Sequence, residues 1–585
     1  MSPVNPVAAS HEFSVYRMQQ YDLHTVPHGC RSASFNLEGR SLTSWSTSRH
    51  CVVARVQDIS IDQFMEIRAK AGALLLVLPK NDTVLTQEEK EHIQLLEMAM
   101  IQQEVNAPVY FARWSPDFED ILRDLQHSFI TDDKSGTALE AMMNTVSSNG
   151  YQIGDLNHLY LNLSTPNSIL FFYSTVVSAS APQKLDSKPV TLHGKLVGRS
   201  GSAQTIVISA HYDSSAIVPE LAQGADSNAS GAVAVLELAR IFSRLYSTAS
   251  VRGGPSLLFV LTSIGHSLNY FSTKKWLEEQ LDSTDAALLQ VSNVFDKLES
   301  SKLSCDQLKW RTNVSYKLTL QFHLLVNHIF FVQDVSFVMC LDSISSSPSM
   351  TMHVSKPPKA GGAAHSIKAR LGVPINHKKI NLADELLAWH HERFSIRRMT
   401  AFTLSSLQSH KDPSRGTVLD TTTELNLKHL ASNIALTARA LASHVYNLTE
   451  EMNAEDAALY NDALAVDEAS IKHWYKYLSS QSRAPQIVTT TSPSQGVTAA
   501  LERALSRYME VTVSQHAVDK REPEYALYGA TSASLYVYSV KPAVFDLILT
   551  LAIVAYLSVV YFAIQLFPRF YEEYAKFITG KTKVN

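Results

Sequence analysis

Cysteine is scarce in this chain of 585 residues, which has four, at positions 30, 51, 305 and 340, and no CxxC pair. A small scaffold stapled by disulfides is therefore excluded, and at roughly 150 residues per domain the length predicts three to four domains, each with its own core. Excess positive charge is also missing, because 51 basic side chains stand against 55 acidic ones, for a net charge of −4. We therefore expect no nucleic-acid partner, since such proteins neutralise phosphates with surplus Lys and Arg.

Several motifs of known chemistry are absent as well. The chain contains no GxSxG, no phosphate-binding P-loop and no dinucleotide fingerprint. The first residues, MSPVNPVAASHEFSVYRMQQYDL, lack the apolar segment of a signal peptide. We expect the true N-terminus, with its signal, to be missing from this sequence.

One long apolar run is present near the C-terminus. Residues 547–567 are 21 positions without a charge. As an α-helix they would be about 31 Å long, which is enough to cross a bilayer. A buried core helix is the alternative, but such helices rarely lack charge over so many positions. The run therefore predicts a transmembrane helix.

The charges on either side of this run predict its orientation. Residues 527–546 hold Lys541 as their one basic residue, whereas the chain after the run carries Arg569, Lys576, Lys581 and Lys583. Because basic residues stay on the cytosolic side, residues 568–585 are predicted to form a cytosolic tail. The large N-terminal part is then lumenal, which makes a single-pass type I protein.

Glycosylation sequons bear on the same orientation. Outside the doubtful stretch 291–333, Asn-x-Ser/Thr occurs at Asn81, Asn162, Asn228 and Asn447, and we take Asn447, Asn228 and Asn81 as the candidate glycosylation sites. Their presence favours the lumenal arrangement. Without a signal peptide, however, the same span makes a tail-anchored protein that faces the cytosol, and this alternative stays open.

The hydrophobic pattern divides the remaining chain into parts. Residues 11–180 contain two apolar runs separated by a polar, helix-prone stretch, which predicts a small N-terminal α/β lobe. Residues 195–450 alternate strand and helix patterns, which predicts a mainly parallel, buried sheet flanked by helices. The expected strands are 205–210, 257–261, 337–341 and 401–404, and the expected helices are 231–246 and 425–447.

Three further segments complete the division. Residues 455–541 hold two helical stretches split by TTTSPSQG, and we interpret them as a helical, membrane-proximal stalk. Residues of about 154–175 and residues 291–333 look foreign to the pattern, because each ends in a Phe/Leu-rich run and interrupts a connection of otherwise ordinary length. They are either retained introns or genuine loop insertions.

Polar side chains gather at the expected strand ends of residues 195–450. The first strand runs into His211 and Asp213, and the following turn, GADSNASG, carries Asp226 and opens a helix. Asp342 and His410 follow two later strands. Since such strand ends form the ligand crevice of an α/β sheet, we expect these side chains to meet. A His oriented by Asp213 and an Asp able to bridge two cations are the beginnings of a two-metal site.

These residues resemble the zinc aminopeptidase and nicastrin superfamily, whose catalytic members hold two zinc ions. Carried over, the resemblance implies one metal on His211, Asp226 and Asp342, and a second on Asp226, His410 and a glutamate. The implied fold class is α/β: an aminopeptidase-like, mainly parallel sheet flanked by helices, with the N-terminal lobe, the helical stalk and one C-terminal transmembrane helix.

The catalytic glutamates of that superfamily are missing. Where its active members have a Glu-Glu pair, this chain has Gly265 at the general-base position and His266 at the ligand position. Histidine can ligate zinc, but glycine cannot accept a proton, and a general base is typically worth about a hundred- to ten-thousand-fold in rate. We therefore expect no catalytic residue, no cofactor beyond residual zinc, and either a vestigial metal site or a hydrogen-bonding scaffold at the strand ends.

Longer stretches resemble the nicalin family more closely. They include HEFSVYRMQQYDL, HYDSSAIVPELAQGADSNASGAVAVLELARIFSRLY, LAWHHERFSIRRMTAFTLSSLQSHKD and VKPAVFDL. The resemblance implies a non-catalytic scaffold subunit in the endoplasmic reticulum membrane, with Nodal modulator and a small multi-spanning membrane protein as partners. It further implies association with the Sec translocon, a role in multi-pass membrane protein biogenesis, and antagonism of Nodal signalling. An active zinc aminopeptidase and a nicastrin-like substrate-recognition subunit are the alternatives.

Overall fold

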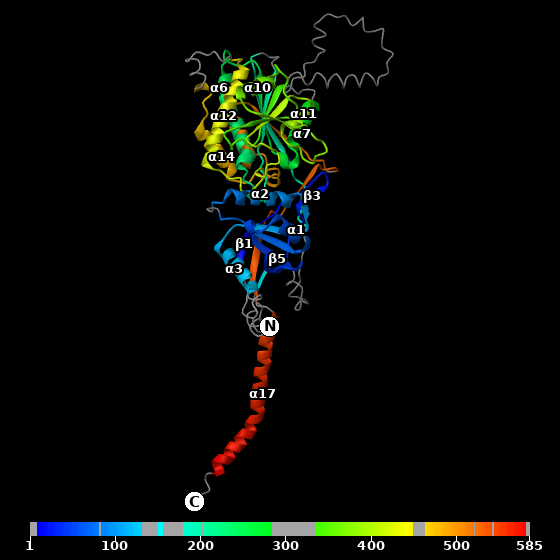
Figure 1. The fold of residues 1–585 in the computed structure, drawn as a ribbon, viewed down its shortest axis with the longest axis vertical. Helices are drawn as coiled ribbons and strands as arrows, with labels where there is room; N and C mark the ends of the chain where they lie inside the picture. The colour runs from blue at the N-terminus through cyan, green and yellow to red at the C-terminus, as the bar shows by residue number, and fades with distance from the viewer. Residues whose placement is uncertain are drawn as a thin grey trace, which may run out of the picture.

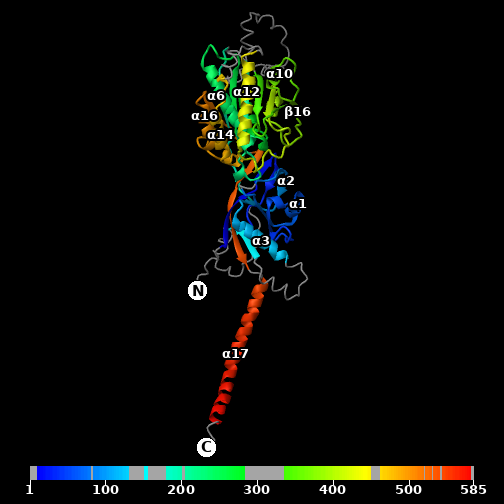
Figure 2. The same ribbon diagram turned by 60° about the vertical axis from the view of Figure 1, so that its left-hand side comes forward.

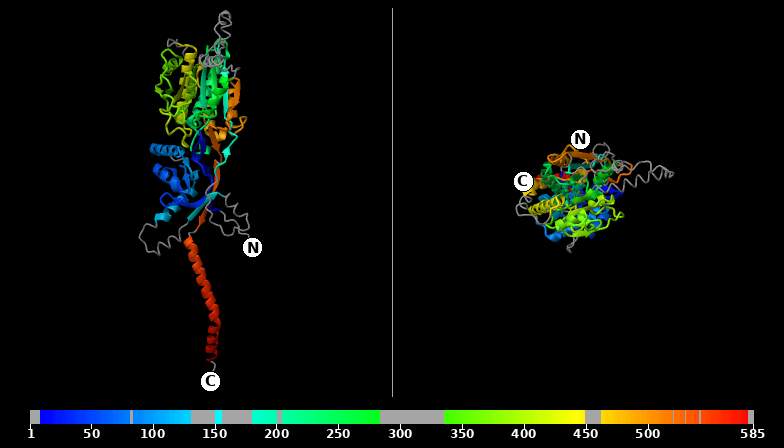
Figure 3. Two further views of the ribbon diagram at one scale, coloured as in Figure 1. Left: turned by 90° about the vertical axis from the view of Figure 1, so that its right-hand side faces the viewer. Right: turned by 90° about the horizontal axis from the view of Figure 1, so that it is seen from above.

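The computed structural model describes residues 9–80, 84–130, 150–155, 180–199, 204–282, 335–448, 462–519, 521–529, 531–540 and 543–580. Its parts follow one another along one axis: a domain with a large sheet, a lobe built around a barrel, and a long helix that leads to the C-terminus (Figure 1). The side view in Figure 3 shows the same order.

Eight strands form the large sheet, in the order β16-β15-β17-β14-β12-β13-β11-β18. The central strands β17, β14, β12 and β13 run parallel to one another, while β11, β15 and β18 join antiparallel. The expected mainly parallel sheet is therefore confirmed. The bounds are β11 Val190–Leu196, β12 Thr205–His211, β13 Ser256–Thr262, β14 Val335–Leu341, β15 Thr351–Val354, β16 Ile375–His377, β17 Ala401–Ser405 and β18 Val511–Gln515.

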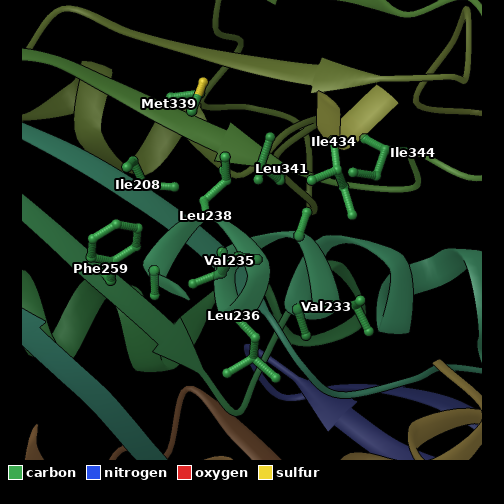
Figure 4. Close-up of a cluster of buried hydrophobic side chains, with 14 of the residues drawn as sticks. Ile208, Val233, Val235, Leu236, Leu238, Phe259, Met339, Leu341, Ile344 and Ile434 are labelled. Atoms are coloured by element: carbon green, nitrogen blue, oxygen red, sulfur yellow. The ribbon is translucent and has the colours of Figure 1, made fainter. Parts of the chain in front are cut away.

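Helices cover both faces of this sheet, which is why β12 and β13 are buried at every position. Ile208 and Phe259 point to the face that carries α6, as Figure 4 shows, whereas Val207 and Val260 pack against Trp276 of α7 on the other face. The helices on the first face are α6 Gly231–Ser247, α10 Ala363–Leu371, α12 Glu424–Val445, α14 Glu468–Ser479 and α16 Gly496–Leu505, and those on the second are α7 Phe271–Asp282 and α11 His391–Ile396.

The lobe is a closed barrel with the strand order β1-β20-β9-β4-β5-β6-β8. Buried positions alternate along β4 and make up all of β6, as expected where one side or both sides of a strand are covered. Helices pack around the barrel. The bounds are β1 His11–Arg17, β4 Asn36–Ser41, β5 His50–Arg55, α1 Ile61–Lys70, β6 Ala73–Val77, α2 Gln87–Ile101, β8 Val109–Ala112, α3 Pro116–Ile130, β9 Gly150–Asp155 and β20 Ser532–Val540.

A third sheet and helix α2 connect the lobe to the domain. The sheet has the order β10-β19-β2-β3-β7, built from Gln183–Lys184, Tyr525–Tyr528, Gln20–Leu23, Val26–Cys30 and Glu104–Val105. Ile93 and Met100 of α2 share one hydrophobic cluster with Ile217 and Val218, which lie in the loop after β12. The lobe therefore packs directly on a loop that follows a central strand of the large sheet.

The expected helical stalk at 455–541 is wrong. Tyr475 and Leu478 of α14 and Leu501 of α16 belong to the core of the large sheet, and α15, Pro485–Val488, lies between these helices in the chain. The following residues are strands of three different sheets, because β18 extends the large sheet, β19 joins the third sheet and β20 closes the barrel. Helical periodicity revealed the buried faces of α14 and α16 but not the sheet on which they pack.

The boundary of the N-terminal lobe is corrected for the same reason. Strand β20 pairs with β1 in a register that places Phe13 opposite Leu535, so the lobe needs a strand from the far end of the chain. Figure 2 shows this orange strand running through the blue lobe. On its other side, β20 pairs with β9, which includes Gly154 and Asp155. The suspected insert at about 154–175 thus begins inside the barrel, and residues 156–175 and 291–333 lie outside the described residues.

Helix α17, Ala543–Gly580, contains the apolar run near the C-terminus. Within the described residues, its segment Leu547–Ile578 is the one helix long and apolar enough to cross a membrane, and the window that meets this test is not buried against the rest of the chain. The helix is therefore the candidate membrane span that residues 547–567 predict. It continues past Pro568, beyond the predicted end of the span.

Candidate functional site

Two of the expected site residues meet at the ends of neighbouring strands. His211 is the last residue of β12, and Asp342 directly follows β14, its parallel neighbour. Both side chains are buried, and Nε2 of His211 lies 3.7 Å from Oδ1 of Asp342. The hydrophobic runs that precede these two residues form the buried strands, so the strand geometry itself brings the imidazole and the carboxylate together.

Asp213 holds the other side of the His211 ring. Nδ1 of His211 is 2.8 Å from Oδ1 of Asp213, whose second oxygen accepts a hydrogen bond of 2.9 Å from the Gly265 backbone N–H. Burial alone would lower the pKa of His211, but the carboxylates of Asp213 and Asp342 raise it to about 9. Without a metal ion, the two carboxylates therefore favour the imidazolium form of this ring.

Arg415 supplies the positive charge that faces Asp342. Its guanidinium forms an ion pair with Oδ2 of Asp342, and it donates to the Tyr270 hydroxyl at 2.7 Å and to the Ala388 carbonyl at 3.0 Å. It also stacks over the Trp389 ring, 4.9 Å from the centroid. The Arg415 side chain is only 3% exposed, so the ion pair is held in a low-dielectric interior.

The electrostatic consequence is a permanently ionised aspartate. Burial would raise the pKa of Asp342, but Arg415 and His211 hold it far below its usual range. The charge of Asp342 is thus compensated by a cation that belongs to the chain. Breaking a buried ion pair by removing one partner typically costs about 3–5 kcal/mol, because the other charge is left uncompensated.

Asp226, the expected bridging ligand, is also committed to protein groups. Its Oδ1 accepts hydrogen bonds from the backbone N–H and the hydroxyl of Ser345, at 2.7 and 2.8 Å. The backbone N–H groups of Asp226 and Ser227 donate in turn to the two oxygens of Asp420. Burial raises the pKa of Asp226, and burial together with Asp226 raises that of Asp420 to about 7.

His266 and His410 lie partly buried in a region of positive potential. Desolvation and then the Arg415 charge hold the pKa of His266 well below its usual range. The pKa of His410 is lowered to about 4 by desolvation, with further contributions from Lys378 and Arg415. Desolvation and these charges favour the neutral form of both rings, and the charges of Arg415 and Lys378 also repel a metal cation.

The residues present do not fit a zinc pair. Across the described ranges, no three His, Cys, Asp or Glu side chains converge in a way that would hold a metal ion. The reason lies in the contacts: Nδ1 of His211 faces Asp213, Asp342 is bound to Arg415, and Asp226 accepts from Ser345. The metal site implied by the resemblance is occupied by hydrogen bonds and an internal ion pair.

The space around Gly265 does not admit a side chain unless neighbouring atoms move. A Cβ atom at this position would lie 2.3 Å from Nδ1 of His211, well inside van der Waals contact. A glutamate at position 265 therefore requires His211 to move, which would break its hydrogen bond to Asp213. The backbone of the loop after β13 therefore lies directly against the His211 ring.

The sequon at Asn228 is corrected by the structure. Asn228 is fully buried, its amide donates to the carbonyls of His211 and Leu341, and its oxygen accepts from the Gly231 N–H. The side chain joins two strand ends to the start of α6 and is closed to a glycosylating enzyme. Asn447 is exposed at the end of α12, and Asn81 lies outside the described residues.

Sequence reasoning missed Arg415, Tyr270, Asp420 and Arg483. Arg483 is fully buried between α14 and α15 and donates to the carbonyls of Tyr212, Gln223 and Gly224, which fixes the loops around Asp226. Arg415, Tyr270 and Arg483 are not of the residue types that ligate zinc, and Asp420 lies well after the end of β17 at Ser405. The signal available for Arg415 was its position five residues after His410, in a loop expected to face the site.

Known proteins resemble this chain over most of its length. Peptidase family M28 matches residues 191–260. The BOS complex subunit ncln of Danio rerio is 36% identical, over 96% of this chain and 92% of that protein. The BOS complex subunit NCLN of Homo sapiens is 35% identical, over 98% and 92%, and the nicalin of Caenorhabditis elegans is 27% identical, over 94% and 89%.

Among solved structures, the crystal structure of the gamma-secretase component nicastrin matches with a TM-score of 0.53. The match covers 90% of this chain and 99% of nicastrin, at 9% sequence identity. At such low identity the likeness is one of fold. It shows that a sheet domain together with a packed lobe is shared, but says nothing of residues or partners.

Proposed function

The chain belongs to the nicalin family, and on that premise we propose that it is a non-catalytic scaffold subunit of an endoplasmic reticulum membrane complex. Its peptidase-like domain binds and positions partners, and α17 anchors it as a single-pass protein with the large part in the lumen. The name BOS complex subunit, carried by relatives at about 35% identity, supports membership in a multi-subunit membrane complex.

One observation carries the non-catalytic part of this proposal, namely the ion pair of Arg415 with Asp342 at the strand ends. An aminopeptidase of this fold requires cations to activate water and a base to take its proton. Here a guanidinium neutralises Asp342, and Gly265 leaves no room for a side chain next to His211. Such a site stabilises the fold rather than cleaving peptides.

The partners follow from the family resemblance. We assign Nodal modulator and a small multi-spanning membrane protein as subunits of the same complex, and the Sec translocon as its neighbour during insertion of multi-pass proteins. An antagonistic effect on Nodal signalling is then a consequence of how the complex handles its clients. The lobe, the third sheet and the exposed span give the chain separate surfaces for lumenal and membrane partners.

The two alternatives are disfavoured by the same contacts. An active aminopeptidase needs free metal ligands, but Asp226 and Asp342 are committed to Ser345 and Arg415. A recognition subunit that captures a free N-terminus needs a carboxylate available to the ammonium group. The carboxylate at the centre of this site already faces a cation.

The test is affinity purification of the tagged, signal-bearing chain from microsomes in mild detergent, followed by mass spectrometry. We expect Nodal modulator and translocon components in near-stoichiometric amounts from the unchanged chain. Recovery of the chain alone, with hydrolysis of aminopeptidase substrates, would overturn the scaffold assignment.

Orientation is tested on the exposed sequon. In a lumenal arrangement Asn447 carries a glycan, so glycosidase treatment shifts the mobility of the unchanged chain more than that of Asn447→Gln. The buried sequon gives the control, because Asn228 is not glycosylated and contributes nothing to the shift. Equal mobility of the unchanged chain and Asn447→Gln would contradict a lumenal Asn447.

A further inference from the structure

The last part of α17 differs in pattern from the apolar run before it. Residues 547–567 carry no charge, whereas residues 569–580 carry four: Arg569, Glu572, Glu573 and Lys576. The helix nevertheless continues without interruption to Gly580. A change from an all-apolar to a mixed composition within one helix indicates that its surroundings change at that point.

The mixed segment is amphipathic. Its apolar residues recur at spacings of one, three and four, which places them on one face of a helix covering about half of its circumference. The charged residues fall on the opposite face. The apolar face consists of Phe570, Tyr571, Tyr574, Ala575, Phe577 and Ile578.

This aromatic face is exposed. The exposed fractions are 67% for Phe570, 68% for Tyr571 and Tyr574, 65% for Phe577 and 56% for Ile578. A continuous exposed apolar surface of this kind, with a charged face behind it, is typical of a helix that binds another phase or another molecule.

The length of the helix favours the membrane surface as that other phase. The 32 residues Leu547–Ile578 extend about 48 Å, whereas the hydrocarbon core of a bilayer is about 30 Å thick. The residues after 567 therefore lie beyond the hydrocarbon once the charge-free run occupies it. Pro568 lacks the N–H that would bond to the preceding turn, so it permits a bend there, and α17 curves in Figure 1.

We propose that residues 569–580 form an interfacial helix, which lies along the membrane surface with its aromatic face among lipid headgroups and upper acyl chains. Tyr571 and Tyr574 present amphipathic rings of the kind enriched at this depth. Arg569 and Lys576 lie on the opposite side, where they reach phosphate groups and water. We assign lipid as the binding partner of the aromatic face because the helix leaves the membrane at this point. The face then already lies next to lipid, and no other molecule has to be recruited.

The inference does not depend on the partners proposed above. It assigns a lipid-binding surface to the tail, which would fix the rotation and depth of the span. A protein partner covering the same face is the competing outcome, and the experiment separates the two.

The test places a fluorescent probe on neighbouring residues of opposite faces. Full-length Tyr574→Cys and Glu573→Cys are labelled with an environment-sensitive maleimide and reconstituted in phosphatidylcholine vesicles. Spin-labelled lipids should quench the probe at position 574 several-fold more strongly than the probe at 573, and iodide in solution should show the reverse order. The pair Tyr571→Cys and Glu572→Cys repeats the measurement should the first pair fold poorly.

The unsubstituted chain, labelled in the same way, gives the background. Cys30, Cys51 and Cys340 are buried, and this background also measures any labelling of Cys305. Equal iodide quenching of both faces would overturn the proposal, because the helix would then stand in water. Protection of position 574 from both quenchers would also overturn it, because a second copy of the chain would then cover the face.

Discussion

The strand ends of the large sheet and the C-terminal helix differ in where their side chains find partners. At the strand ends, the charges of His211, Asp213, Asp342 and Arg415 neutralise one another in the interior. In α17, apolar side chains over Leu547–Ile578 face outward, and the most apolar window is not buried by the rest of the chain. The difference teaches that the charges at the strand ends are compensated within the fold, whereas the apolar surface of the candidate membrane span is left for surroundings outside the chain.

The largest expected effect comes from breaking the buried ion pair between Arg415 and Asp342. Arg415→Met keeps the length of the side chain but removes the charge, which leaves Asp342 buried against His211 alone. We expect a loss of about 3–5 kcal/mol in the free energy of unfolding. Urea unfolding of the full chain in mild detergent, followed by tryptophan fluorescence, measures it.

A surface ion pair provides the matched control. Arg397 lies 3.4 Å from Glu278, and both side chains are about one-third exposed. Arg397→Met should therefore cost less than about 1 kcal/mol. Equal losses in the free energy of unfolding for the two variants would show that the buried Arg415 pair contributes no more stability than the surface pair.

The next effect is a dependence on pH. Because the pKa of folded His211 is raised from 6.5 to about 9, its contribution is complete below the unfolded value and is lost as pH rises through about 9. The loss is on the order of 3 kcal/mol. The urea midpoint should fall between about pH 7 and pH 9 in the unchanged chain, and fall less in His211→Gln.

Other titrating groups do not account for this window. The folded pKa values of Glu97 and Asp420 are raised to about 7, so their contribution to the pH dependence lies mainly between their unfolded values and about 7. A midpoint that stays level above pH 7 in both the unchanged chain and His211→Gln would contradict an imidazolium at the site.

A smaller effect is expected from adding one methyl group. Gly265→Ala places a Cβ atom 2.3 Å from the His211 ring, and such overpacking typically costs about 1–3 kcal/mol. Gly254→Ala is the control, because no atom lies within 4 Å of a Cβ there. Gly265→Glu should destabilise the chain further and produce no aminopeptidase activity, and activity in that variant would contradict the closed site.

The smallest expected effect is that of metal removal. Because Asp226 and Asp342 are bound to Ser345 and Arg415, a chelator has no structural ion to extract. The unfolding midpoint of the chain purified without chelators should therefore be unchanged by EDTA. A clear drop, restored by added zinc, would show that the strand ends hold a metal.

The strands and their ends were predictable because their signal is local. A buried parallel strand is a continuous apolar run, and the polar residue that ends it faces the crevice, which is how His211 and Asp342 were found. Arg415 was not predictable in this way, since its partner Asp342 lies on another strand and only the folding of the loop after β17 brings them together.

Long-range pairing limited the prediction of the domains. The alternating pattern of residues 532–540 is that of a strand, but nothing local shows that it pairs with residues 11–16 at the other end of the chain. The apolar faces of α14 and α16 likewise give no indication of the sheet that they cover. Residues 455–541 were therefore interpreted as a stalk, although they belong to the folded domains.

The most direct test of the internal cation is a double-mutant cycle on Arg415 and Asp342. Arg415→Met and Asp342→Asn each leave one buried charge uncompensated, whereas the double variant leaves neither. The double variant should lose less stability than the two single variants lose together, and the difference should be an interaction energy of about 2–3 kcal/mol. Strictly additive losses of stability would show that the two charges do not interact. They would contradict the account in which Arg415 compensates the charge of Asp342.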